Sequence, residues 1–132
     1  MSQTIYLETN YYGTKKLFYA FKAFNQHGGD FNQGARIVNI TSNLAHVQSA
    51  MGNKELLEAK RNTRERFDQV QNTRELDGLI LEFQHAVECG RVQEDKWPRC
   101  AYTISKMATN AFTRYYEFHK VHWNFYMQFT SL

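Results

Sequence analysis

Tyr102 and Lys106, a tyrosine and a lysine four residues apart, are the side chains of this sequence best suited to chemistry. Residues at this spacing lie on one face of a helix, where their side chains meet. An ammonium beside a phenol favours the phenolate, so that the phenol gives up its proton more readily. The spacing therefore predicts a proton donor at Tyr102, activated by Lys106. The same spacing also occurs in ordinary surface pairs of tyrosine and lysine that perform no chemistry, and this alternative stays open.

Two further polar residues precede this pair in the chain. Ser42 follows the apolar, β-branched run Arg36–Thr41, which predicts a buried parallel strand. The carboxyl ends of such strands are where α/β proteins place their chemistry. Asn10 lies in the run TNYYGT at residues 9–14 and is predicted to open an aromatic-rich helix over residues 8–26. The alternatives are that Ser42 caps a turn and that Asn10 is a helix N-cap.

In this order, the three motifs resemble the short-chain dehydrogenase/reductase family, whose catalytic set is asparagine, serine, tyrosine and lysine. The resemblance covers about residues 5–118 and places that set at Asn10, Ser42, Tyr102 and Lys106. The monomeric NADPH-dependent carbonyl reductases are the most similar members. The run KWPRCAY that ends at Tyr102 resembles their Trp-Pro-x-x-Ala-Tyr stretch, and their long insertion before the tyrosine corresponds to residues 43–98.

The resemblance implies a function and a role for each site residue. The function is NADPH-dependent reduction of small aldehydes and ketones to alcohols, with Tyr102 as the proton donor. Lys106 would also hold the nicotinamide ribose, and Ser42 would bond the substrate carbonyl. Asn10 would hold a water that links Lys106 to solvent, so that Asn10, Tyr102 and Lys106 form the cofactor side of the site. The insertion implies a monomer for a complete member, because it covers the helix face through which other members oligomerise.

Some family motifs have no counterpart in these 132 residues. No glycine follows a strand with the spacing of the family's Gly-rich turn, which seats the cofactor pyrophosphate. Pro98 is the only proline, so the family's later Pro-Gly loop is also missing. We therefore expect one partial domain over residues 1–132, an α/β, Rossmann-like and mostly helical fold. It would lack the N-terminal nucleotide-binding half and the C-terminal strand, and it would end in a divergent tail at 119–132.

Two functions from different classes follow from this comparison. The first is an NADPH-dependent carbonyl reductase. The second is a catalytically inactive, truncated fragment or isoform that folds only partly or with a partner, and that self-associates through its uncovered apolar faces. Because backbone groups of a buried strand must be paired, a lone strand without neighbours favours the second function for the isolated chain.

Composition excludes several other classes. The net charge of +3 comes with interleaved acidic and basic residues, which is typical of a solvated surface and not of a nucleic-acid interface. Two cysteines fit neither a disulfide framework nor a zinc cluster. His119 and His122 lack a third ligand nearby in sequence, so we predict no metal site. The sequence has no visible signal peptide and no apolar run long enough for a membrane, which predicts a cytoplasmic protein.

The remaining elements are predicted from caps and helical periodicity. Asn53 is a suitable N-cap for a charged helix to about residue 70. Asn72 and Glu75 resemble a capping box before a second helix, which Gly90 ends. A loop at 91–99 leads to a long helix over residues 100–118, and the aromatic tail could form a strand.

Overall fold

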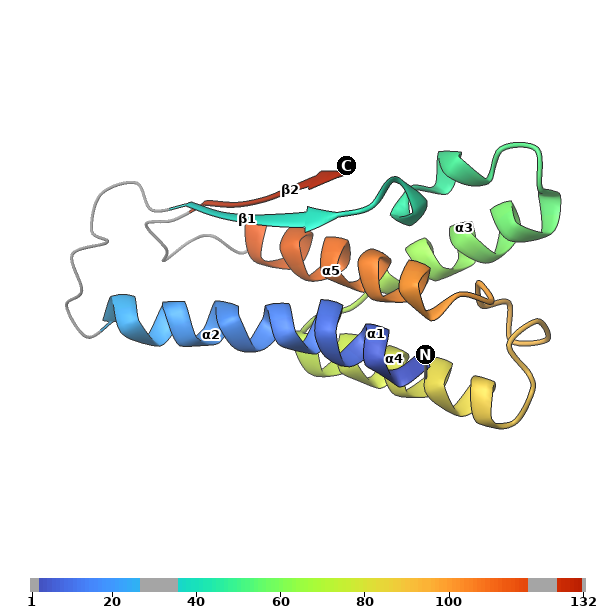
Figure 1. Cartoon of the computed structure of the whole chain (residues 1–132), viewed down its shortest axis with the longest axis horizontal. Coiled ribbons are helices and arrows are strands. Elements are labelled where there is room, and N and C mark those ends of the chain that lie inside the picture. The colour runs from blue at the N-terminus through green and yellow to red at the C-terminus, as the bar shows by residue number, and fades with distance from the viewer. Residues whose placement is uncertain (1–2, 27–35, 119–125, 132) are drawn as a thin grey trace.

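The computed structural model describes residues 3–26, 36–118 and 126–131 of the chain. A long central helix, α5, has a two-stranded parallel sheet on one side and helices α2 and α4 on the other (Figure 1). The order along the chain places α3 and α4 between the first strand and α5. The bounds of these elements are α2 Gly13–Gln26, β1 Arg36–Thr41, α3 Lys54–Asp68, α4 Thr73–Glu88, α5 Ala101–Phe118 and β2 Tyr126–Ser131.

The first helical segment is longer and less regular than its sequence predicts. It begins as the short helix α1 (Gln3–Tyr6) and continues through a π-helical turn, η1 (Leu7–Tyr12), into α2. The prediction that Asn10 opens or caps this helix is wrong, because Asn10 lies inside the π turn. The N–H of Gly13 donates to the carbonyl of Glu8, five residues back, as a π turn requires. A Cβ at position 13 would lie 3.3 Å from that carbonyl oxygen, so glycine suits this close approach.

The sheet contains the strand predicted at residues 36–41 and a second strand from the aromatic tail. β1 spans Arg36–Thr41, as its β-branched run predicts. β2 pairs with it in parallel, with Arg36 opposite Tyr126 and Thr41 opposite Ser131. The prediction that the aromatic tail could form a strand is therefore confirmed for Tyr126–Ser131. That the chain lacks the family's own C-terminal strand stays a prediction. Aromatic and hydroxyl residues favour extended backbone there, and the crossover through three helices allows the parallel sense.

The helices of the middle segment begin and end at the predicted caps. The Asn53 side chain accepts a hydrogen bond from the N–H of Leu56 at 3.0 Å, which confirms it as the N-cap of α3. The Asn72 side chain likewise accepts from the N–H of Glu75 at 3.0 Å. The Glu75 carboxylate accepts from the N–H of Gln71 at 2.8 Å, one residue before the position that a capping box would use. After α4, Gly90 takes a left-handed conformation with φ of 69°, as expected of a glycine C-cap.

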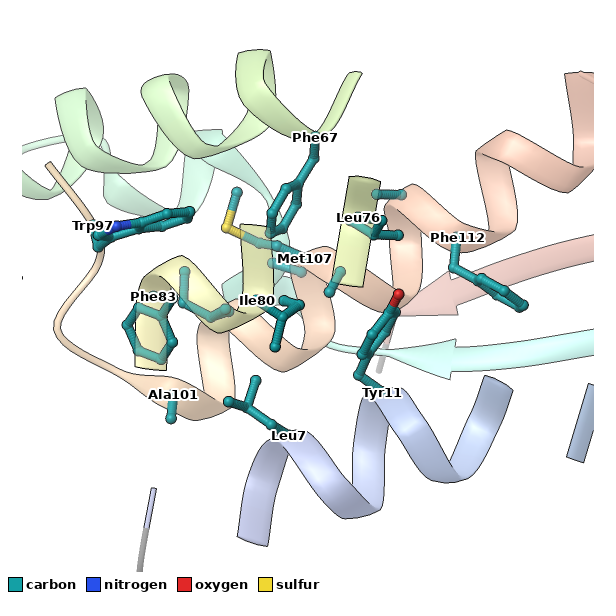
Figure 2. Close-up of a cluster of buried hydrophobic side chains, with 14 of the residues drawn as sticks. Leu7, Tyr11, Phe67, Leu76, Ile80, Phe83, Trp97, Ala101, Met107 and Phe112 are labelled. Carbon is teal, nitrogen blue, oxygen red and sulfur yellow. The ribbon is translucent and has the colours of Figure 1, made fainter. Parts of the chain in front are cut away.

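The core lies where α4 and the first helix meet α5, as Figure 2 shows. Large side chains with at most 3% exposure fill it, and they come from the first helix, from the middle segment and from α5: Leu7, Tyr11, Phe18, Phe67, Leu76, Ile80, Phe83, Trp97, Met107 and Phe112. Segment 43–98 thus supplies about half of the core. This dependence makes the candidate-site helix α5 and the middle segment one packed body.

Some apolar surface is left uncovered on β1 and α2. Asn39 points towards α5 and donates to Thr113, so its neighbours Val38 and Ile40 point to the opposite face of the sheet. Val38 and Ile40 are 52% and 55% exposed. Leu17 and Phe21, one turn apart on α2, are also more than half exposed. Parallel sheets are normally covered on both faces, but none of the described helices packs over Val38 and Ile40 on this face of β1.

Candidate functional site

Lys106 connects α5 to the carboxyl end of β1. Its Nζ atom donates a hydrogen bond to the carbonyl oxygen of Ile40 at 3.2 Å. The same Nζ atom lies 5.8 Å from the centre of the Tyr102 ring, which confirms that the two side chains share one face of the helix. Both side chains are partly exposed, and the Tyr6 ring packs edge-on against Tyr102. The tyrosine and lysine therefore lie beside the strand end at which parallel sheets place chemistry.

Asn10 is held against the same helix through both its side chain and its backbone. The side-chain Nδ2 donates to the Ser105 hydroxyl at 3.0 Å. The Thr109 hydroxyl donates to the backbone carbonyl of Asn10, also at 3.0 Å. Ser105 and Thr109 are 0% and 2% exposed, so these bonds are shielded from water. The π turn thus places Asn10 against Ser105, the residue that directly precedes Lys106.

Ser42 directly follows β1 and begins the next turn. Its hydroxyl accepts a hydrogen bond from the N–H of Leu44 at 3.2 Å, as the N-cap of the short 3₁₀ turn η2 (Asn43–Ala45). This confirms the turn-capping role that the sequence left open. The cap uses the oxygen as an acceptor, so the hydroxyl can still donate to another oxygen. η2 in turn packs against α5.

Three contacts therefore tie the predicted residues to one region of the fold. Tyr102 contacts Lys106, Lys106 contacts β1 two residues before Ser42, and Asn10 contacts the neighbour of Lys106. That the Ser42 hydroxyl lies near the Tyr102 hydroxyl stays a prediction. So does the catalytic role of all four residues.

A row of buried hydroxyls on α5 was missed by sequence reasoning. Ser105, Thr109 and Thr113 recur every fourth residue and face the first helix and β1. The Thr109 hydroxyl lies 2.9 Å from the Ser105 carbonyl as well as 3.0 Å from the Asn10 carbonyl, so its single proton is shared between them. The Thr113 hydroxyl accepts from Asn39 and donates to the Thr109 carbonyl at 2.8 Å. The spacing is visible in the sequence, but hydroxyl residues in a helix have no single role until their neighbours are known.

A second polar contact joins the residue after Asn10 to the middle segment. The Tyr11 hydroxyl donates to Asp77 of α4 at 2.8 Å, and Lys15 forms an ion pair with the same carboxylate at 2.5 Å. Burial, followed by the hydrogen bond to Asp77, raises the pKa of Tyr11 well above its usual value. Tyr11 is therefore a neutral structural donor at physiological pH, and it holds α4 against the π turn.

The described residues do not fit the pyrophosphate of a dinucleotide. Gly13 and Gly78 lie within helices, and Gly52 and Gly90 lie in turns that follow helices. Within residues 36–118 and 126–131, neither strand leads through a glycine turn into a helix N-terminus, which is the usual cradle for that group. The histidine pair at 119 and 122 lies outside the described residues. Among the residues that are described, no three metal-binding side chains cluster, and no helix is long and apolar enough to cross a membrane.

Two known proteins are similar to this chain in sequence or in structure. No family model matches the chain. It is 33% identical over 112 residues to "Short-chain dehydrogenase/reductase 1" of Saponaria officinalis, a match that covers 82% of this chain and 33% of that protein. The structure of menthone neomenthol reductase from Mentha piperita is similar with a TM-score of 0.65 at 30% identity, over 90% of this chain and 38% of that one.

The chain is therefore similar in sequence and in fold to short-chain dehydrogenase/reductases. The expectation of this family from the sequence motifs is confirmed at that level. The chain spans about a third of the length of the plant relative that it matches.

Proposed function

We propose that this chain carries the proton-transfer part of an NADPH-dependent carbonyl reductase site, which reduces aldehydes and ketones to alcohols. The observation that carries the proposal is the position of Lys106. Its ammonium lies between the Tyr102 ring and the carbonyl of Ile40, at the strand end that Ser42 follows. A phenol beside an ammonium at this end of a parallel strand is suited to proton transfer to a substrate oxygen.

Each residue has one task in this proposal. Tyr102 gives its phenolic proton to the carbonyl oxygen, which becomes the alcohol oxygen. Lys106 stabilises the phenolate that remains, and the Ser42 hydroxyl donates to the same substrate oxygen. Lys106 then passes a proton to the Tyr102 phenolate, and a water positioned by Asn10, which Ser105 and Thr109 hold, returns a proton to Lys106. The hydride for the carbonyl carbon is the chemistry that the nicotinamide cofactor supplies.

In this proposal the site residues transfer the proton, and a separate segment binds the nucleotide. Because the described residues offer no phosphate cradle, we propose that reduction requires a glycine-rich segment in addition to these 132 residues. The protein would then be cytoplasmic and monomeric, would bind small carbonyl compounds and not nucleic acid, and would contain 43–98 as its helical insertion. NADPH would contact Asn10, Tyr102 and Lys106.

One observation favours the alternative, that the isolated chain is catalytically silent and needs a partner. Val38 and Ile40 leave one face of the sheet uncovered, and two strands form at best a marginal sheet. Under this alternative the site residues are inherited from a reductase but perform no reaction, and residues 119–132 replace the family's usual ending.

A fusion protein tests the proposal. We would join the glycine-rich nucleotide-binding segment of a short-chain dehydrogenase/reductase to the start of this chain and follow NADPH oxidation with a panel of aldehydes and ketones. We expect Tyr102→Phe to lower kcat by about 10²- to 10⁴-fold and to leave NADPH binding unchanged, since it removes only the proton donor.

Tyr115→Phe, on the same helix, is the matched control and should keep the activity of the unmodified fusion. If Tyr102→Phe retains full activity, Tyr102 is not the proton donor and the proposal is wrong. A fusion that folds and binds NADPH but reduces no carbonyl compound would favour the silent alternative.

A further inference from the structure

Lys60 of α3 is a buried lysine whose ammonium bonds to a single segment of the chain. The residue is only 2% exposed. Its Nζ atom donates to the carbonyl of Leu44 at 2.5 Å, to the hydroxyl of Ser49 at 2.6 Å and to the carbonyl of His46 at 3.4 Å. An ammonium has three donors, and here all three point at residues 43–50, the stretch between Ser42 and α3.

This burial is costly for a lysine. Removing an ammonium from water without a carboxylate partner is unfavourable, and the acceptors here are neutral. Burial lowers the pKa of Lys60, and the neighbouring Cys100 opposes that effect. Lys54, at the start of the same helix, is exposed, as lysines usually are. The three hydrogen bonds from this buried ammonium therefore restrict the movement of the segment that supplies the acceptors.

The segment held by Lys60 is the one that holds Ser42. Both backbone groups of Leu44 are bonded, because its N–H donates to the Ser42 hydroxyl and its carbonyl accepts from Lys60. The N–H of Ala45 also donates to the backbone carbonyl of Ser42 at 2.9 Å. A path of hydrogen bonds thus runs from the Lys60 ammonium through the backbone of Leu44 to the Ser42 hydroxyl.

We propose that Lys60 is a positioning residue: it clamps residues 43–50 onto α3 and so fixes the orientation of the Ser42 hydroxyl. The importance of that orientation rests on the proposed function, in which Ser42 donates to the substrate oxygen. The clamp itself does not depend on the proposed function, because it is a property of the folded chain that can be measured without any reaction.

The clamp has a spectroscopic signature and a local dynamic one. With ¹⁵N-labelled lysine in the 132-residue chain, the shielded Lys60 ammonium should give a slowly exchanging N–H correlation peak that Lys60→Met removes. Amide hydrogen exchange at Leu44 and Ala45 should become at least about tenfold faster in Lys60→Met, because bonds from a charged donor are lost. Exchange at the α4 core residue Ile80 should not change.

Lys54→Met is the matched control, since it removes an exposed ammonium from the same helix. It should leave the exchange of residues 43–50 unchanged. If Lys60→Met does not fold, Ser49→Ala removes one acceptor from an exposed loop position and should accelerate the same amides by a smaller factor.

Two results would overturn the inference. The clamp is absent if residues 43–50 exchange at the wild-type rate in Lys60→Met, or if exchange accelerates equally in α4. The positioning role is absent if the fusion protein described above keeps its wild-type kcat in Lys60→Met although the loop is loosened. We expect kcat to fall with the KM for NADPH unchanged. An inactive fusion would refute the proposed function while the exchange data still decide on the clamp.

Discussion

Lys96→Gly should stabilise this protein, although glycine usually destabilises. Lys96 has a φ of 56°, and among the described residues it is the only one other than glycine with a positive φ. Its left-handed conformation ends the turn in which Trp97 donates its N–H to the Val92 carbonyl at 2.8 Å. This turn places Trp97 in the core at 2% exposure, against Phe67 and Phe83.

The expected gain follows from two opposing contributions. An L-residue in the left-handed region costs roughly 1–2 kcal/mol, which glycine does not incur, although glycine loses about 0.5–1 kcal/mol more in chain entropy. Lys96 also forms an ion pair with Glu58 at 3.0 Å. Both partners are about 60% exposed, so its loss costs at most about 0.5 kcal/mol. The free energy of unfolding should therefore rise by about 0.5 kcal/mol, or about 2 °C in Tm.

Chemical and thermal unfolding followed by circular dichroism would measure this change. Lys96→Ala is the control, because it removes the same ion pair but keeps a Cβ atom. We expect it to be neutral or destabilised by a few tenths of a kcal/mol, about the value of an exposed pair. If Lys96→Gly is less stable than Lys96→Ala, the left-handed conformation carries no strain and the reasoning is refuted.

Three other predictions concern the cofactor, pH and the uncovered sheet. The 132-residue chain should show no saturable NADPH fluorescence change at micromolar concentrations, and saturable binding would contradict the missing phosphate cradle. The free energy of unfolding should fall above about pH 10, because the unfolded chain releases the Tyr11 proton there while the folded chain retains it. Urea titrations at several pH values should show a smaller decline for Tyr11→Phe than for the wild type. The wild-type chain should self-associate in light scattering, and the double variant Val38→Thr, Ile40→Thr should do so less. A monodisperse wild-type monomer with a sharp, reversible transition would contradict the uncovered sheet.

The local elements and the relationship to a family could be predicted from the sequence. Asn53 and Asn72 cap their helices in the predicted way because a cap is formed by residues two or three positions apart. The strand Arg36–Thr41 follows from its β-branched run, and the shared face of Tyr102 and Lys106 follows from helix geometry. None of these depends on a distant part of the chain.

Contacts between distant residues decided the rest. The π turn at Asn10 is held by hydrogen bonds to Ser105 and Thr109, more than 90 residues away in sequence, so helical periodicity could not predict it. β2 forms because β1 offers its edge in parallel, and the tail alone could not specify that partner. Lys60 lies in a helix rich in charged residues, where an exposed side chain would be expected. It is buried only because residues 43–50 fold over its ammonium. A sequence pattern fixes what neighbouring residues can do, whereas burial and long-range hydrogen bonds exist only once the chain has folded back on itself.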